Sequence, residues 1–313
     1  MMNTAVVLAC DDNYVAYSSC VARRIHSNAS TKIPIVVLAD CVSDRNRAKA
    51  LSVCPHIEFV EVGPLLEGKP FSLLGHLTRA TYSRLLLAEL LSGLDQALYL
   101  DSDIAVLGDV APLAFTKLIA APVAAAHDLP MYGAHRQIAK RPVTPGRPYF
   151  NGGVAVYDLK AVKSEGIFEN AQRFSFDHPD RCAYHDQDAL DQVLDGRWQV
   201  LDWRWNAMSF LTETMPGLPI VRHLTGNKPW SANKTDIEPE IISLWHDDLL
   251  DSPWPELFKS ASGGIEVKDR WLRTKICEQL PGPRGRSARF KRDIACAYRE
   301  IERTVGQLAT PLL

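Results

Sequence analysis

The sequence has few cysteines, no long apolar run and little net charge. Seven cysteines are spread over 313 residues and no two form a Cys-x-x-Cys pair, which argues against a disulfide framework and against a zinc ribbon. No stretch reaches the roughly 18 to 20 apolar residues that a helix needs to cross a bilayer. The net charge of -2 excludes the strongly basic composition that is typical of nucleic-acid-binding proteins. We therefore expect a soluble protein with reduced thiols, located in the cytoplasm.

The opening segment also lacks two familiar signals. It contains an apolar run with no basic residues ahead of it, and Asp11-Asp12-Asn13 ends this run where a signal peptide would continue. The glycine fingerprint G-x-G-x-x-G of a dinucleotide-binding turn does not follow it. The sequence thus predicts neither export through such a signal nor the usual dinucleotide site.

Short apolar segments alternate with helical patterns along the first hundred residues. We expect strands at 5–10, 33–39, 57–62 and 96–100, with helices at 14–27, 43–52 and 77–92. This alternation predicts an α/β fold with a mainly parallel, doubly wound sheet. Further along we expect strands at 123–126 and 154–157, a proline-rich loop at 131–148, and helices at 161–174 and 185–194. A loop of that length in a compact domain is usually a lid or a binding loop.

Two carboxylates follow the apolar segment at 96–100. Asp101 and Asp103 are two residues apart, so in a continuing strand both side chains would lie on one face and could bind one divalent cation. In open α/β sheets, ligands bind at the carboxyl ends of strands, which is where these residues stand. A pair of carboxylates in a solvated turn is the alternative interpretation, and the same pattern recurs at Asp186-Gln187-Asp188.

Polar residues also stand at the end of the first expected strand and on a later expected helix. Asp11 and Asn13 could form hydrogen bonds with a base or a ribose. Capping of the next helix by Asp12 or Asn13 is the alternative. Arg84 suits a phosphate or a carboxylate partner, and an exposed arginine is the alternative there.

Two later stretches add an amide, an imidazole and a loop that could hold phosphate. Asn151 precedes two glycines that allow close backbone approach, although a simple bulge would show the same pattern. His223 follows a short apolar run and could bind a metal or be structural. The loop from Gly226 to Lys228 could surround a phosphate with its amides and its ammonium group.

Taken in this order, these stretches resemble family 8 of the retaining glycosyltransferases, in particular the bacterial enzymes that add galactose or glucose to lipopolysaccharide cores. The resemblance covers roughly residues 3 to 230. It rests on Asp11-Asp12-Asn13-Tyr14, Thr81-Tyr82-Ser83-Arg84, Leu98-Tyr99-Leu100-Asp101-Ser102-Asp103, Tyr149-Phe150-Asn151-Gly152-Gly153, His185-Asp186-Gln187-Asp188 and the segment from His223 to Trp230. The last segment has one residue between Gly226 and Lys228, where the family commonly has two.

The resemblance implies a nucleotide-diphosphosugar transferase (GT-A) fold, a UDP-hexose donor, and a saccharide or glycolipid acceptor. It assigns Mn²⁺, with Mg²⁺ as a substitute, to Asp101, Asp103 and His223, and this mixed oxygen and nitrogen shell suits Mn²⁺ better than Ca²⁺. Further contacts that it implies are Asp11, Asn13 and Ser102 to uridine, Gly226 and Lys228 to the diphosphate, Arg84, Asp128, Asn151, Asp186 and Gln187 to the donor sugar, and His76 to the acceptor.

The resemblance further places Gln187 and Asp188 nearest the anomeric carbon, and we take Asp128 as a third catalytic residue. An amide is a poor nucleophile, so a covalent adduct on Gln187 is not expected. Asp188 is the candidate if an adduct forms. We expect front-face transfer, in which the leaving diphosphate oxygen takes the proton of the acceptor.

The last part of the chain is basic. Residues 268–300 carry ten Lys or Arg against four Asp or Glu, so the rest of the chain has a net charge of -8. Within this part, apolar residues recur at helical spacing, at Phe290, Ile294, Tyr298, Ile301 and Val305. We divide the chain into a catalytic domain at 1–265 and a basic amphipathic tail at 266–313. The tail either packs on the body or holds the protein peripherally on an anionic membrane surface, the inner face of the plasma membrane.

Two other functions fit fewer of these features. Asp101 and Asp103 also suit a phosphohydrolase of the haloacid-dehalogenase type, but that motif usually lies in the first strand, and here three expected strands precede it. A catalytically dead protein that only binds a nucleotide sugar is the second, and the presence of both carboxylates and His223 speaks against it. No nucleic-acid partner is expected.

Overall fold

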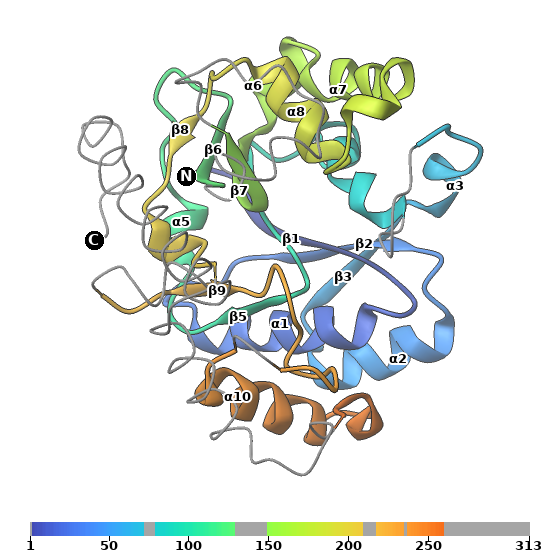
Figure 1. Cartoon of the computed structure of the whole chain (residues 1–313), viewed down its shortest axis with the longest axis vertical. Helices are drawn as coiled ribbons and strands as arrows, with labels where there is room; N and C mark the ends of the chain where they lie inside the picture. Colours follow the sequence, from blue (N-terminus) through green and yellow to red (C-terminus); the bar gives the residue numbers. More distant parts are fainter. Residues whose placement is uncertain (1, 72–78, 129–148, 209–216, 235–236, 260–313) are drawn as a thin grey trace, which may run out of the picture.

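A twisted seven-stranded sheet forms the centre of the molecule (Figure 1), with strands in the order β3-β2-β1-β4-β7-β6-β8. The structure is a computed structural model that describes residues 2–71, 79–128, 149–208, 217–234 and 237–259. The strands of the sheet are β1 (Thr4–Asp11), β2 (Ile35–Asp40), β3 (Ile57–Glu61), β4 (Gln96–Leu100), β6 (Val123–His127), β7 (Phe150–Asp158) and β8 (Gln199–Val200). Within this sheet only β7 runs against the others, since it pairs antiparallel with both β4 and β6. The expected mainly parallel α/β fold is confirmed.

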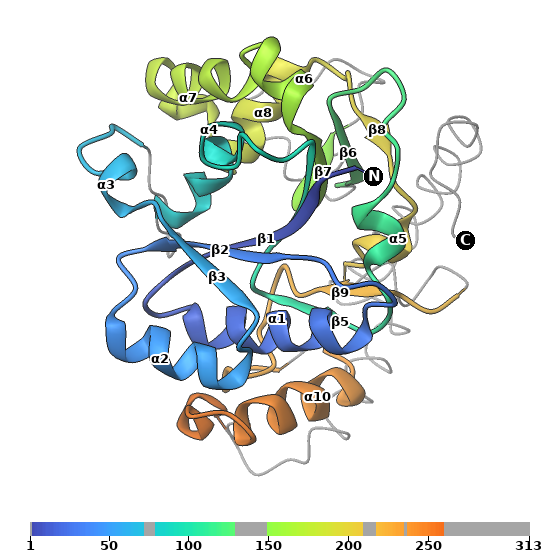
Figure 2. The same ribbon diagram turned by 180° about the vertical axis from the view of Figure 1, so that it is seen from behind.

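Helices cover both faces of this sheet (Figures 1 and 2). One face carries α1 (Val15–Asn28) and α2 (Asp44–Val53), with α10 (Pro239–Leu250) packed outside α1. The other face carries the 3-10 helix η1 (Arg79–Leu86), α4 (Leu87–Leu90), α6 (Leu159–Ser164), α7 (Ile167–Asp177) and α8 (Asp186–Leu194). The remaining short helices are α3 (Gly63–Leu66), α5 (Ala111–Ala114), η4 (Pro179–Arg181), η5 (Trp203–Trp205) and η6 (Pro255–Leu257). Among the described residues, none of the helices combines the length and the apolar character needed to span a bilayer.

The strands are apolar on both sides because both faces of the sheet are covered. In β1, Val6 and Leu8 pack into the core beneath α1, whereas Ala5 and Val7 pack into the core on the opposite face. Successive side chains of a strand point to opposite faces, so each strand reads as a nearly continuous apolar run. This is the pattern from which β1 to β4 are predicted.

Two expected helices differ from the structure. Of the expected helix at 77–92, residues 79–90 form the 3-10 helix η1 followed by a single α-helical turn, and residues 77 and 78 lie outside the described part of the chain. Consecutive side chains from Tyr82 to Leu86 are buried, rather than one face only. Packing between the sheet and helices α7 and α8 therefore decides its geometry, not an amphipathic pattern. The pattern at 161–174 forms two helices, because Gly166 adopts a left-handed conformation with φ of 63° and separates α6 from α7. The expected loop at 131–148, His76 and the tail at 266–313 lie outside the described residues.

A second, two-stranded sheet lies beside the main one and was not predicted. Its strands β5 (Ile104–Val106) and β9 (Val221–His223) are antiparallel, and Ile104 is paired with His223. Each strand has only three residues, too few to show a period in the sequence. The pairing is what brings His223 to the carboxyl end of β4.

Candidate functional site

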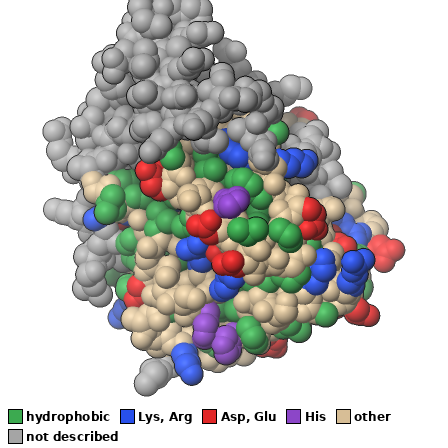
Figure 3. Space-filling model, turned by 90° about the horizontal axis from the view of Figure 1, so that it is seen from below, with side chains coloured by type: hydrophobic (Ala, Val, Ile, Leu, Met, Phe, Trp, Pro, Cys, Tyr) green, Lys and Arg blue, Asp and Glu red, His purple; other side chains and the backbone are tan. Residues whose placement is uncertain are grey.

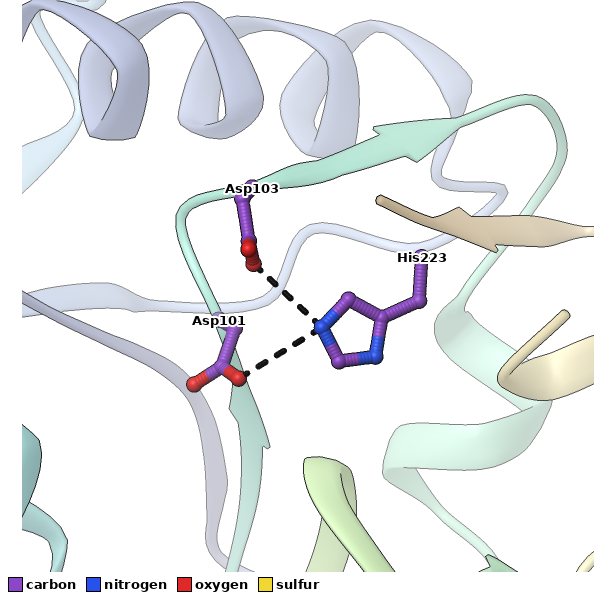
Figure 4. Close-up of side chains that lie close together, drawn as sticks. All are labelled: Asp101, Asp103 and His223. Carbon is purple, nitrogen blue, oxygen red and sulfur yellow. Dashed lines mark ion pairs between the residues drawn. The ribbon is translucent and has the colours of Figure 1, made fainter. Parts of the chain in front are cut away.

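Two carboxylates and one imidazole converge where β4 ends (Figure 4). Asp101 directly follows β4, Asp103 directly precedes β5, and His223 is the last residue of β9. The Nε2 atom of His223 lies 3.3 Å from Oδ1 of Asp103 and 3.6 Å from Oδ2 of Asp101. Each residue offers one ligand atom, and these three atoms lie within 4.8 Å of one another. The structure thus brings the three predicted metal ligands together, and their role as ligands stays a prediction.

Gly153 of β7 forms the wall behind these three residues. Its carbonyl oxygen accepts a 2.8 Å hydrogen bond from the backbone N–H of Asp101. A Cβ atom at this position would lie 2.8 Å from Oδ2 of Asp101 and would overlap the imidazole ring of His223. The site therefore needs a glycine here because the backbone of β7 approaches both side chains closely.

The donor set suits a divalent cation of borderline hardness. Carboxylate oxygens favour Mg²⁺ or Mn²⁺, and imidazole shifts the preference toward the transition metals. Nδ1 of His223 is hydrogen bonded to Oδ1 of Asn206 at 2.9 Å, which leaves Nε2 to face the two carboxylates. Although burial raises it, the ammonium of Lys228 holds the pKa of Asp103 well below its usual value, so this ligand is ionised.

Arg84 of η1 lies beside this group with its guanidinium buried. Nε lies 2.5 Å from Oδ2 of Asp186, Nη1 donates to the carbonyl of Gly152 at 2.5 Å, and Nη2 lies 3.5 Å from Oδ1 of Asp101. The guanidinium also stacks over the ring of Tyr99, 4.5 Å from its centre. Burial raises the pKa of Asp186 to about 7, against the opposing effect of Arg84. Arg84 is therefore a buried cation that pairs with carboxylates of the site, and the alternative of an exposed arginine is wrong.

Two glycine N–H groups fix the amides of Gln187 and Asn151. Gly152 N–H donates to Oε1 of Gln187 at 2.8 Å, and Gly153 N–H donates to Oδ1 of Asn151 at 3.0 Å. Both side-chain NH2 groups then donate to Oδ2 of Asp128, at 3.2 and 2.9 Å. Three of the five side chains predicted at the donor sugar, Asp128, Asn151 and Gln187, thus form one hydrogen-bonded group.

Asp188 lies behind the wall of the cleft. Its Oδ1 accepts from the hydroxyl of Tyr149 at 2.9 Å, and its Oδ2 accepts from the backbone N–H of Tyr184 at 2.7 Å. The side chain is buried. Among the described residues that line the cleft, Asp186 and Gln187 are present and Asp188 is not. The predicted catalytic role of Asp188 stays a prediction, and this position suits a residue that supports the wall.

A cleft of about 460 Å³ joins these groups to the end of β1. Of the residues predicted for donor or metal, Asp11, Arg84, Asp101, Ser102, Asp103, Asp128, Asn151, Asp186, Gln187, His223 and Lys228 line it. Asn13 and Gly226 are not among the described lining residues, and His76 is outside the described part of the chain.

Asp11, the last residue of β1, lines the cleft and also holds the turn that leads into α1. Oδ1 of Asp11 accepts the backbone N–H groups of Asn13 and Tyr14 at 3.0 and 3.1 Å. These bonds hold the turn that precedes α1, whose N-cap Tyr14 has no side-chain capping bond. Asp12 accepts from the backbone N–H and the hydroxyl of Ser43, the N-cap of α2. The alternative that Asp12 or Asn13 caps α1 is therefore wrong.

Lys228 reaches the metal-ligand group from the loop after β9. Its ammonium lies 2.5 Å from Oδ2 of Asp103 and also donates to the carbonyl of Leu224. The shorter spacing after Gly226 therefore still delivers a cation to the cleft.

A sequence model of glycosyl transferase family 8 matches residues 5–234, which contain the whole of this constellation. The chain belongs to glycosyl transferase family 8. It is 27% identical over 254 residues to general stress protein A of Bacillus subtilis (strain 168), covering 73% of this chain and 87% of that protein. It is 29% identical over 214 residues to the lipopolysaccharide 1,2-glucosyltransferase of Escherichia coli (strain K12), covering 62% of this chain and 61% of that protein.

Solved structures agree with this assignment. The galactosyltransferase LgtC, in complex with donor and acceptor sugar analogs, superposes with a TM-score of 0.67 at 26% identity, covering 84% of this chain and 98% of that chain. The apo structure of the bifunctional glycosyltransferase WbbM matches with a TM-score of 0.65 at 22% identity, covering 84% and 52%. The family 8 chain described here therefore has the GT-A-like fold and is a glycosyltransferase, and the haloacid-dehalogenase alternative is wrong.

Sequence reasoning missed several residues of this family 8 site. Tyr14, Thr81, Tyr184 and Met208 line the cleft, and Asn206 bonds His223 from outside it. Asn206 follows a tryptophan-rich segment, where no period or motif separates it from an ordinary loop asparagine. Its one signal is indirect: a metal-binding His223 needs a hydrogen-bond partner on Nδ1.

Proposed function

We propose that this family 8 glycosyltransferase transfers a hexose, galactose or glucose, from a UDP-sugar to a saccharide or glycolipid acceptor with retention of the anomeric configuration. Its reaction would belong to the synthesis of lipopolysaccharide or a related surface glycan. The LgtC and lipopolysaccharide glucosyltransferase similarities support the sugar and the acceptor class. The observation that carries the proposal is the convergence of Asp101, Asp103 and His223 beside the buried Arg84 in one cleft.

We assign Mn²⁺, with Mg²⁺ as a substitute, to these three ligands. When bound, the ion supplies Lewis-acid stabilisation of the charge on the leaving diphosphate. Lys228, whose ammonium already reaches Asp103, can donate hydrogen bonds to the same diphosphate. Asp11, Asn13 and Ser102 are assigned to uridine, and Gly226 to the diphosphate loop.

The hydrogen-bonded group around Asp128 is assigned to the donor sugar. Asn151 and Gln187 have both of their amide positions fixed by the glycine N–H groups and by Asp128, so they are held in place before substrate binds. Asp186 and Arg84 extend this group toward Asp101. Hydroxyl groups of a hexose need donors and acceptors at fixed positions, and this group offers both.

Front-face transfer is the mechanism that this arrangement favours. Gln187 is an amide and a poor nucleophile, and both carboxylate oxygens of Asp188 accept hydrogen bonds behind the cleft wall. The acceptor would attack on the side from which the diphosphate leaves, and the departing diphosphate oxygen would take its proton. Mass spectrometry of enzyme quenched during turnover tests this directly, because a glycosyl adduct on Asp188 would overturn it.

A thermal-shift titration with UDP, with and without Mn²⁺, tests the donor assignment. We expect UDP to raise the unfolding temperature only when Mn²⁺ is present, since the diphosphate and the carboxylates are both anionic. A shift of equal size without metal contradicts the assignment. Hydrolysis of the UDP-sugar then separates an active transferase from a protein that only binds the nucleotide sugar.

We also propose that the basic tail brings the enzyme to its acceptor. A glycolipid acceptor lies in a membrane, and the ten Lys or Arg within 268–300 would be attracted to anionic headgroups. The enzyme would then attach peripherally to the inner face of the plasma membrane, from the cytoplasm. This proposal treats residues 1–265 as the catalytic domain and residues 266–313 as the tail.

A further inference from the structure

One buried asparagine connects the metal-ligand group to the donor-sugar group. Asn206 is fully buried, and its side-chain amide contacts both. Oδ1 lies 2.9 Å from Nδ1 of His223, and Nδ2 lies 2.9 Å from Oδ1 of Asn151. Among the described residues, no other side chain is hydrogen bonded to both His223 and Asn151.

The direction of each hydrogen bond follows from one backbone group. Gly153 N–H can only donate, so the Asn151 atom that it contacts is the carbonyl oxygen. The Nδ2 atom of Asn151 then donates to the carboxylate of Asp128, which can only accept when ionised. Asn206 must therefore present its NH2 group to Asn151 and its oxygen to His223.

The same reasoning fixes the tautomer of His223. Because Asn206 offers His223 an acceptor, Nδ1 of His223 carries a proton and donates it. In the neutral ring, Nε2 then presents its lone pair to the space shared by Asp101 and Asp103. A metal ligand needs this lone pair, so the backbone of β7 determines through two amides which nitrogen of His223 can bind.

Asn206 is placed by rigid backbone. It ends the 3-10 helix η5, its N–H donates to the carbonyl of Trp203, and the flanking Trp203 and Trp205 are buried. The next residue, Ala207, donates to the carbonyl of Val221 and accepts from the N–H of His223, each at 2.9 Å. The segment is thus joined to β9 on both sides of the ligand that it supports.

We propose that Asn206 is a positioning residue that holds His223 in the metal-binding tautomer and at the same time holds Asn151 at the donor sugar. The metal half of this inference rests on the proposed function. An acceptor on the second nitrogen of a metal-binding histidine commonly changes metal affinity by 10–100-fold. The two halves of the amide make the two roles separable by substitution.

The metal-binding half of the inference is tested by titrating the full-length protein with Mn²⁺. Electron paramagnetic resonance measures binding as the loss of the signal of free Mn²⁺. Asn206→Ala removes the acceptor, and we expect affinity for Mn²⁺ to fall by about 10–100-fold. Asn206→Asp keeps an acceptor for Nδ1–H, and we expect Mn²⁺ affinity within a few-fold of wild type. Asn170→Ala, at an exposed position of α7, is the matched control and should bind Mn²⁺ as wild type does.

The Asn206→Asp variant also tests the sugar half. Its carboxylate would face the carbonyl oxygen of Asn151, two acceptors with no proton between them, so we expect turnover of the UDP-sugar at saturating Mn²⁺ to fall at least tenfold. A general loss of folding would lower Mn²⁺ affinity and turnover together, whereas the inference requires them to separate. Should Asn206→Ala fail to fold, this separation decides alone.

Four results would count against the inference or against its premise. Wild-type affinity for Mn²⁺ in Asn206→Ala, or a loss of affinity in Asn206→Asp equal to that in Asn206→Ala, overturns the inference. Wild-type turnover in Asn206→Asp removes its sugar half. A wild-type protein that binds no Mn²⁺ instead contradicts the proposed metal site itself, and with it the metal role of Asn206.

Discussion

The metal-ligand group leaves no space for a side chain at Gly153. Replacing Gly153 by Ala places a methyl group against the imidazole of His223 and 2.8 Å from Asp101. Because the carbonyl of Gly153 is hydrogen bonded to the backbone N–H of Asp101, β7 cannot move away without shifting this ligand, and we expect Mn²⁺ affinity to fall at least tenfold. Mn²⁺ titration of Gly153→Ala measures this. Gly93→Ala, at a position with open space and no positive φ, serves as the control, and equal affinities in the two variants would refute the steric argument.

His127 makes the stability of the fold depend on pH. It ends β6, is fully buried against Trp198 and has a pKa lowered by burial to about 4, below its ordinary value of 6.5. The unfolded chain therefore binds a proton at this position at higher pH than the folded chain does. Its contribution to stability is complete above pH 6.5 and is lost as the pH falls toward 4, by about 2 kcal/mol at pH 5.

The variant His127→Gln tests this directly. Urea unfolding at pH 5 and pH 7.5 should show a smaller loss of stability at pH 5 in the variant than in wild type, by about 2 kcal/mol. The comparison uses the change between the two pH values within each protein, so any constant cost of the substitution cancels. Identical pH dependence in both proteins would show that folding does not lower the pKa of His127.

At the scale of elements, the site depends on how short pieces of chain are joined. The sheet and its strand ends are predictable from apolar runs, which is why Asp11 and Asp101 could be placed at the carboxyl ends of strands, whereas Gln187 was assigned to the site only through the family resemblance. The three-residue strands β5 and β9 carry no period, so the pairing that delivers His223 could not be predicted. The 3-10 helix η1 likewise follows from packing around Arg84 and not from its own pattern.

One buried carboxylate of helix α10 forms ion pairs with two arginines of α1. Asp248 of α10 accepts hydrogen bonds from Arg23, at 2.8 Å, and from Arg24. Asp248→Ala leaves two guanidinium groups without their shared partner, and we expect the free energy of unfolding to fall by about 2 to 3 kcal/mol. Urea denaturation measures this. Asp247→Ala, on the neighbouring exposed position, should change stability by less than about 0.5 kcal/mol, and equal losses in both variants would contradict the account.

For the whole molecule, charge separates the body from the tail. On the face that the grey atoms leave visible in Figure 3, acidic and basic side chains are interspersed among hydrophobic ones, with no extended basic area. The local excess of positive charge lies in residues 268–300. Attraction to an anionic surface is therefore a prediction about the tail, drawn from sequence alone.

Neutralising part of that charge in the full-length chain tests it. Replacing Arg286, Arg289, Lys291 and Arg292 by Gln removes four charges worth about 1 kcal/mol each near an anionic surface, which predicts a loss of roughly 10³-fold in binding to phosphatidylserine vesicles. Vesicle co-sedimentation measures it, with neutral phosphatidylcholine vesicles as the control. UDP-sugar hydrolysis should remain at the wild-type rate, and unchanged binding to anionic vesicles would mean that the tail is structural.

The central claim is that Asp101, Asp103 and His223 hold the divalent ion on which transfer from a UDP-sugar depends. The measurement that tests it most directly is the hydrolysis of UDP-galactose and UDP-glucose by wild type, Asp103→Asn and His223→Gln, with Mn²⁺ and with EDTA. We predict turnover of at least one donor by wild type with Mn²⁺, none with EDTA, and a loss of at least 100-fold in both variants. Equal turnover with EDTA, or wild-type rates in the variants, would contradict the account.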